Sequence, residues 1–143
     1  MVKRPQPLCL ALLVCDAVVT DRNTDKISIL GTFSEILADG LPVLVPQLTV
    51  YAELTNGHGE TTVQLRLSRV EPKPVEAAGD ILGQTLGLWE FPIVFDSPLR
   101  IYNLHITAMN LYLLDFGDYR FSVEVEGEII LERCISLALR RRP

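Results

Sequence analysis

Residues 47–70 read QLTVYAELTNGHGETTVQLRLSRV, and apolar and polar side chains alternate on both sides of the turn signal at residues 56–59. Alternation with a period of two is typical of a β-strand that turns one face towards a hydrophobic core. The two glycines favour a reverse turn, because glycine adopts the positive φ angles that tight turns require. The stretch therefore predicts two strands, residues 47–55 and 60–70, that pair as an antiparallel hairpin.

The same alternation returns near the end of the sequence, in residues 120–126 and 129–139, with a tight reversal at Gly127 between them. In all four strands the apolar residues are expected to face one shared core. These residues are Leu48, Val50, Ala52, Leu54, Val63, Leu65, Leu67, Phe121, Val123, Val125, Ile129, Leu131, Ile135, Leu137 and Leu139. Arg133 interrupts the last apolar face and is expected at its rim.

A longer apolar run occupies residues 8–20. Its basic start superficially suggests a signal peptide, but the uninterrupted apolar stretch is short and the pattern continues to Thr20, which favours a β-strand buried on both faces. A turn-rich cluster follows at residues 21–25, and residues 26–37 form the next apolar run. We expect these two runs to pair as a first hairpin.

Two further segments are less regular. In residues 81–95 the apolar positions change phase around Glu90. Pro92 lacks the N–H of a ladder hydrogen bond, so this segment is expected at a sheet edge or as two short pieces. In residues 100–113 a similar phase change predicts a bulge near Met109.

Together these patterns predict an all-β fold, an antiparallel β-sandwich of seven or eight strands with an immunoglobulin-like or related Greek-key topology. A closed barrel is the alternative architecture. The chain has 143 residues, which suits one domain. We expect that domain to span residues 8–139, after a flexible segment at 1–7 and before a basic tail at 140–143. The one helical turn that we expect lies within residues 74–79.

Charge is distributed unevenly along the chain. Five of its 13 basic residues lie at the two ends, which leaves eight in the body against all 18 acidic residues and a formal charge of about −10 there. An acidic body repels phosphate groups, so we expect no nucleic-acid partner. No apolar run approaches the roughly 20 residues that span a bilayer, so we expect no membrane partner either.

The three cysteines, Cys9, Cys15 and Cys134, all lie in apolar runs. Cys9 and Cys15 would stand about 20 Å apart along one strand, too far for a disulfide, although either could meet Cys134 across strands. No cysteine–histidine spacing is typical of a zinc site. We interpret all three as reduced thiols in a cytoplasmic protein, with a secreted disulfide protein as the alternative.

The search for chemistry finds single candidates but no catalytic set. Asp16, Asp21 and Asp25 lie in or near the first turn, where loops at one end of a sandwich can bring oxygens together, and His58 lies in the glycine-rich turn. These four residues are the candidates for a loop-end site, although turn formation and solvent exposure explain them more simply. No nucleophile motif, phosphate-binding glycine loop or metal-binding pattern is present, so we predict no enzyme activity and no cofactor.

Three aromatic residues, Tyr51, Trp89 and Tyr112, are the candidates for an interface, because tyrosine and tryptophan are enriched at protein–protein contacts. Packing in the core or across strands is their alternative role. The leading functional hypothesis is a non-enzymatic module that binds a protein partner or a second copy of itself, with edge strands as its means of pairing. The alternative is a domain that binds a small molecule or a carbohydrate, or a weak hydrolase, with a cleft between loops.

Several motifs resemble one known family. They are CDAV at 15–18, KISILGTF at 26–33, LTVYA at 48–52, GHG at 57–59, FGDYRF at 116–121 and VEGE at 125–128. Their order and content resemble a family of small, uncharacterised bacterial proteins, a domain of unknown function, over nearly the whole chain. The resemblance implies a β-sandwich without an assigned activity, and it supplies no catalytic or binding residue.

Overall fold

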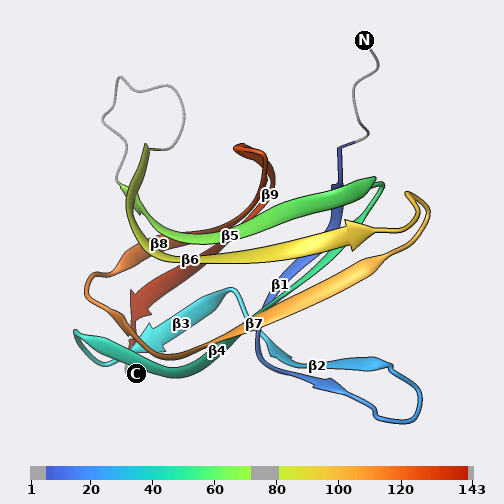
Figure 1. Ribbon diagram of the computed structural model, residues 1–143. Coiled ribbons are helices and arrows are strands. Elements are labelled where there is room, and N and C mark those ends of the chain that lie inside the picture. Colours follow the sequence, from blue (N-terminus) through green and yellow to red (C-terminus); the bar gives the residue numbers. More distant parts are fainter. Residues whose placement is uncertain (1–5, 72–80, 142–143) are drawn as a thin grey trace.

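The computed structural model describes residues 6–71 and 81–141, and within them it contains strands and turns but no helix. The strands are β1 (Leu8–Thr20), β2 (Ile27–Thr32), β3 (Glu35–Ala38), β4 (Val43–Thr55), β5 (Gly59–Glu71), β6 (Ile81–Phe95), β7 (Tyr102–Leu113), β8 (Gly117–Val125) and β9 (Glu128–Leu139). They form two layers, so the predicted all-β sandwich is confirmed (Figure 1). The helical turn expected at 74–79 lies outside the described residues.

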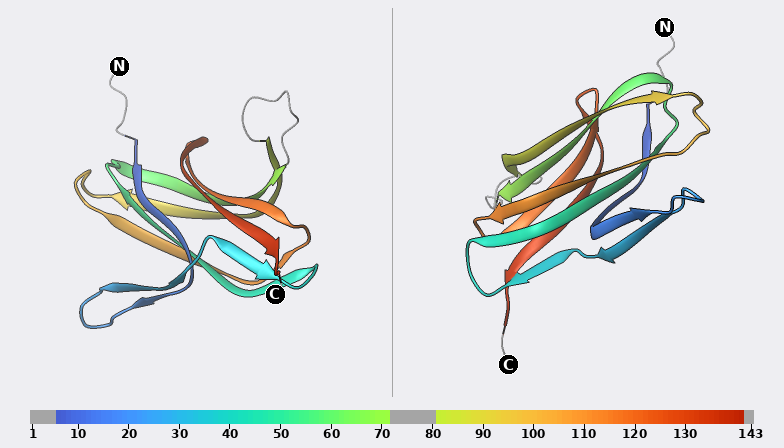
Figure 2. Two further views of the ribbon diagram at one scale, coloured as in Figure 1. Left: turned by 180° about the vertical axis from the view of Figure 1, so that it is seen from behind. Right: turned by 60° about the horizontal axis from the view of Figure 1, so that its bottom comes forward.

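The strands are shared between a four-stranded sheet, in the order β2-β1-β4-β7, and a five-stranded sheet, in the order β3-β9-β8-β5-β6. All neighbours are antiparallel except β3 and β9, which run parallel. Figure 2 shows that the long strands of the five-stranded sheet curl over the other layer. The nine strands of the described residues exceed the predicted seven or eight, because the chain leaves one sheet after Thr32 and begins β3 in the other sheet at Glu35.

The core lies between the sheets and contains most of the residues predicted to face it. The four predicted core residues of β4 have no exposed surface: Leu48, Val50, Ala52 and Leu54. The predicted core residues of β5 and β8 are each about 1% exposed. Ile135 and Leu137 of β9 are also buried. The prediction is wrong for Ile129 and Leu139, which are 44% and 54% exposed. A register shift after Val123 places Ile129 opposite Glu124, on the outer face, and Leu139 is the last residue of β9.

Two of the predicted hairpins are confirmed. β1 pairs with β2, and β8 pairs with β9 across a tight turn in which Glu126 and Gly127 both have positive φ angles, 52° and 81°. Positive φ at both central residues is the geometry of a type I′ turn, which matches the twist of the flanking strands.

The predicted hairpin of β4 and β5 is wrong, because these strands lie in different sheets. Residues 56–58 carry the chain from the four-stranded to the five-stranded sheet. The apolar faces of β4 and β5 therefore meet in the core from opposite sides. Asn56 N donates a hydrogen bond to Pro98 O at 2.9 Å, and a Cβ added at Gly57 would lie 2.4 Å from ring carbons of Phe95. The loop therefore packs against the connection between β6 and β7 instead of closing a ribbon.

The irregular strands behave differently from each other. β6 is continuous and lies at the edge of its sheet, so the edge position predicted from Pro92 is confirmed. The phase change predicted in β7 is present, but the register with β4 is the same on both sides of it, so no bulge inserts a residue. Instead Asn110, with a φ of 54°, lies opposite Pro46, and both strands change face together at that point.

Two predictions about side-chain exposure also need correction. β1 is buried on both faces only in its middle, since Leu8 and Leu10 are more than half exposed and Val19 is almost half exposed. Arg133 lies opposite Phe121 on the inner side of β9, not at a rim, and its Nε is buried without a hydrogen-bond partner among the described residues.

Candidate functional site

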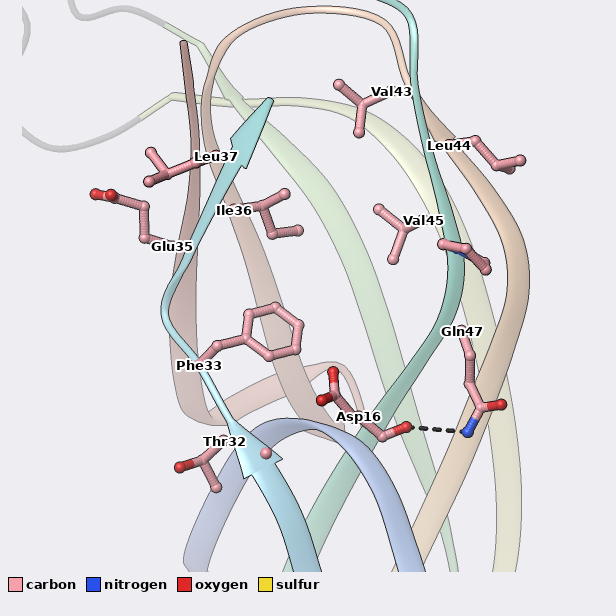
Figure 3. A pocket seen from close by; sticks show the side chains of 12 residues that line it. Asp16, Thr32, Phe33, Glu35, Ile36, Leu37, Val43, Leu44, Val45 and Gln47 are labelled. Atoms are coloured by element: carbon pink, nitrogen blue, oxygen red, sulfur yellow. Dashed lines mark hydrogen bonds between the residues drawn. The ribbon is translucent and has the colours of Figure 1, made fainter. Parts of the chain in front are cut away.

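A cavity lies on one flank of the sandwich, between β3 and the beginning of β4. We call it the β3–β4 cleft. Its volume is about 510 Å³, within the range of ligand-binding pockets. Its apolar walls are formed by Phe33, Ile36, Val43 and Val45, and polar atoms come from Asp16 and Gln47. Figure 3 shows Ile36 and Val45 pointing towards each other across it.

The cleft exists because the four-stranded sheet divides. β1 pairs with β4 only as far as Cys15 opposite Thr49, and from Cys15 onwards it pairs with β2. The β1–β2 ribbon therefore swings away from β4, as Figure 1 shows. Among the described residues, the backbone of residues 43–48 has β7 on one side and no strand on the other. We call that second side the free edge of β4.

The point of separation is held by side chains. Gln47 Nε2 and Thr49 Oγ1 both donate hydrogen bonds to the main-chain oxygen of Asp16, at 3.0 and 3.2 Å. Side chains of β4 thus satisfy a carbonyl of β1 where the strand ladder between them ends. This arrangement fixes the position of Asp16 at the bottom of the cleft.

The opposite wall is β3, which pairs with β9 on one side and forms the edge of its sheet on the other. Ser136 N donates to Ser34 O at 2.9 Å and Arg140 N donates to Ala38 O at 2.8 Å, so both ends of the short strand are held. Ile36 turns into the cleft, whereas Glu35 and Leu37 point to the other side of the strand (Figure 3).

Of the two described acids that line the cleft, Asp16 points its carboxylate into it, towards Phe33, and Glu35 does not (Figure 3). Gly31 makes this position available, because a Cβ at residue 31 would lie 2.3 Å from Asp16 Oδ2. Gly31 also has a φ of +67°, a conformation that glycine adopts without strain. Within the described part of the chain, the Asp16 carboxylate has no hydrogen bond or ion pair, and no lysine, arginine or histidine lines the cleft.

The other acids of the predicted loop-end site lie elsewhere. Asp21 and Asp25 belong to the tip of the β1–β2 ribbon, where Asp21 Oδ1 accepts hydrogen bonds from the main-chain N–H groups of Asn23 and Thr24 at 2.8 and 3.1 Å. These bonds lower the pKa of the Asp21 carboxyl, because they favour its charged form. Asp25 has a φ of 57° in the same turn. The two acids shape the turn.

His58 is exposed in the crossing between β4 and β5 and does not line the cleft. Within the described residues, no three histidine, cysteine, aspartate or glutamate side chains are close enough to hold a metal ion. Of the four predicted loop-end residues, the structure therefore places only Asp16 in a cavity of this size.

The three predicted interface residues have different surroundings. Tyr51 is only 4% exposed, and its hydroxyl donates to Glu53 Oε1 at 2.6 Å. Burial and the Glu53 carboxylate raise the pKa of Tyr51 to about 12. Trp89 packs against the core, and its ring lies over Gly87, where a Cβ would come within 2.4 Å of Cη2. Tyr112 is 59% exposed, so of the three it has by far the most accessible ring.

The cysteines are free, and no two of them form a disulfide. Cys15 is buried and Cys9 is partly buried, and burial raises the pKa of both thiols. Cys134 is exposed, which differs from the buried position expected from its apolar neighbours, because Cys134 lies on the outer face of β9. Arg120 Nε donates to its sulfur at 3.5 Å.

The residues of the cleft other than Asp16 were missed in the sequence. The predicted strand begins at residue 47, and the two prolines of residues 42–46 do not suggest a strand, whereas residues 43–46 form the beginning of β4. The signal that could have identified them is Pro46, because proline within a strand favours an edge position with no ladder partner at its nitrogen.

The fold and the cleft define a two-sheet β-sandwich with one open flank. The chain belongs to DUF6941, a family of unknown function, whose sequence profile matches residues 10–138. This match confirms the resemblance to a family without an assigned activity. No curated protein sequence matches the chain.

Two solved structures are similar to parts of this fold. A β-glucosidase from Chaetomella raphigera is 15% identical over 92% of this chain and 18% of that chain, with a TM-score of 0.47. A β-glucosidase from Kluyveromyces marxianus is 12% identical over 78% of this chain and 16% of that chain, with a TM-score of 0.43. The chain spans less than a fifth of the length of either enzyme. Among the described residues, no helix is long and apolar enough to cross a membrane.

Proposed function

We propose that this protein is a non-enzymatic interaction module that binds an extended segment of another polypeptide along the free edge of β4, over the β3–β4 cleft. The observation that carries the proposal is the backbone of residues 43–48, which, among the described residues, lacks a strand neighbour on the side of the open cleft. The free thiols of Cys9, Cys15 and Cys134 support a cytoplasmic location.

Strand addition suits this edge for two physical reasons. Unpaired N–H and C=O groups in a strand are a template for another strand, and the new ladder provides the affinity. Successive side chains of an added strand point to opposite faces, so every second one would enter the cleft between Ile36 and Val45. The partner we infer therefore has alternating apolar residues over about one strand length.

The composition of the cleft supports binding over catalysis. Among the described residues, no serine, cysteine, histidine or lysine lines it, and Glu35 points away from Asp16, so no two of these groups converge as an acid and a base. Its volume of about 510 Å³ also suits a small molecule, which is the alternative function.

The test uses a fluorescein-labelled synthetic peptide of alternating valine and threonine, about eight residues long, the length of an ordinary strand. Two analogues carry backbone N-methyl groups on alternate residues, either on all valines or on all threonines. Valine must face the cleft, so the register is fixed and only one set of N–H groups points to β4. We expect saturable binding of the parent peptide and of one analogue, measured by fluorescence anisotropy.

Amide chemical shifts then locate the bound peptide. Perturbations should concentrate in residues 35–38 and 43–48. β6 and β7 are the internal controls, since each also lies at the edge of a sheet. Equal binding of both N-methylated analogues, or perturbations centred on β6 or β7, would overturn the proposal. Sedimentation without peptide shows whether a second copy already occupies the edge, and a dimer with protected amides at 43–48 would make this chain its own partner.

A further inference from the structure

We infer that Asp16 selects a cationic side chain, lysine or arginine, in the polypeptide segment that the β3–β4 cleft binds. The inference rests on the proposed function and adds a chemical requirement to it. The single observation behind it is a carboxylate that points into an apolar cleft and has no hydrogen bond or ion pair among the described residues.

The position of this carboxylate is fixed by two features of the fold. The main-chain oxygen of Asp16 is held by Gln47 and Thr49, which prevents the residue from leaving the end of the β1–β4 ladder. Gly31 on the neighbouring strand leaves the space that the carboxylate occupies. The carboxylate is thus built into the floor of the cleft, at the point where the free edge of β4 begins.

The surroundings suit a long basic side chain. Phe33, Ile36 and Val45 present apolar surface above Asp16, and the methylene groups of lysine or arginine pack well on such surface while the charged end reaches a polar partner. In the part of the chain that the structure describes, no cationic residue lines the cleft and competes for the carboxylate. The rest of the body is acidic as well, so a basic partner is attracted to it before contact.

The size of the effect follows from the exposure of Asp16, which remains accessible to solvent. Exposed ion pairs contribute little, which corresponds to a preference of about twofold to fivefold for a cation over an uncharged side chain of the same length. A carboxylate in the same place of the peptide should bind more weakly than either, because like charges repel. The preference should decrease as salt is added.

The experiment replaces one residue of the valine–threonine peptide at a time with lysine, norleucine or glutamate, over every position. Norleucine is an uncharged side chain of similar length to that of lysine. Affinities are compared for the wild-type protein, Asp16→Asn and Glu35→Gln. Glu35 is the matched control, since it lies on β3, in the opposite wall of the cleft, but directs its carboxylate to the other side of that strand.

We expect the wild-type protein to prefer lysine over norleucine at one position of the peptide, Asp16→Asn to lose that preference, and Glu35→Gln to keep it. Equal affinities for lysine and norleucine at every position in the wild-type protein, with one N-methylated analogue still inactive, would overturn the role of Asp16 and leave the strand-binding function intact. A lysine preference that persists in Asp16→Asn would likewise overturn the role of Asp16 and leave the strand-binding function intact. Failure of every peptide to bind would overturn both proposals.

Discussion

Replacing Gly57 with alanine tests the crossing between the two sheets. A Cβ at this position would lie 2.4 Å from Cγ and Cδ2 and 2.6 Å from Cδ1 of Phe95, more than 1 Å closer than ordinary contact between carbon atoms at about 3.5–4 Å. Phe95 is 2% exposed and packs edge-on against Tyr102, with ring centroids 4.9 Å apart, so its ring has no free direction in which to move. Overpacking of this kind costs about 1–3 kcal/mol.

Equilibrium unfolding in urea measures this cost. With an m-value of about 2 kcal/mol per molar urea, a loss of about 2 kcal/mol moves the midpoint down by about 1 M. Gly40→Ala is the control, because nothing lies within 4 Å of its added Cβ, and we expect a change below about 0.5 kcal/mol. Combining Gly57→Ala with Phe95→Leu should recover part of the loss, as a double-mutant cycle would show.

The outcome that would refute this reasoning is a Gly57→Ala protein as stable as the wild type or more stable. That result is expected of a loop whose residue 57 points into solvent, as in the hairpin that the sequence predicts. It would mean that the aromatic ring does not cover the loop and that β4 and β5 are not divided between two sheets at this point.

Three further predictions follow from the core, the buried phenol and the cleft. Leu65→Ala should lower the free energy of unfolding by about 2–5 kcal/mol in denaturant titrations, since this side chain is 1% exposed, and a loss below about 1 kcal/mol would contradict its place in the core. The pKa of Tyr51 is about 12 in the fold and about 10 in an unfolded chain, so the fold holds the proton more tightly. The stability due to this group is complete below pH 10 and is lost between about pH 10 and 12, and Tyr51→Phe should remove that decline, whereas an unchanged slope would contradict the assignment. Gly31→Ala should cost about 1–2 kcal/mol because of its positive φ, and it should abolish the lysine preference as Asp16→Asn does, so a retained preference would show that residue 31 does not position the carboxylate.

The faces of the long strands were predictable from the sequence, because a period of two leaves little choice of which side turns inward. The inner faces of β4, β5 and β8 match the prediction residue by residue. Pairing was less predictable. The turn at 56–59 fits both a hairpin and a crossing between facing sheets, since alternation specifies a core face but not the sheet that contains it.

The candidate site was predictable only in part. Asp16 was identified because it lies near a turn-rich cluster, yet its surroundings come from the division of the four-stranded sheet. Phe33, Ile36 and Val45 look like ordinary core residues in the sequence, and their accessibility depends on where β1 leaves β4, which is a tertiary event. Pro46 and Gly31 lie where the four-stranded sheet divides, but the sequence alone does not show this, because the strand order must be known first.

The parallel pairing of β3 with β9 has a consequence for synthesis on the ribosome. Glu35 pairs with Ser136, so one wall of the cleft cannot form until almost all of the chain has emerged from the exit tunnel. Contacts between such distant residues also form slowly, because the intervening loop must close first. A nascent chain that already contains β1, β4 and β7 therefore exposes the free edge of β4 without its opposing wall, and this is the stage at which chaperones would have most to protect.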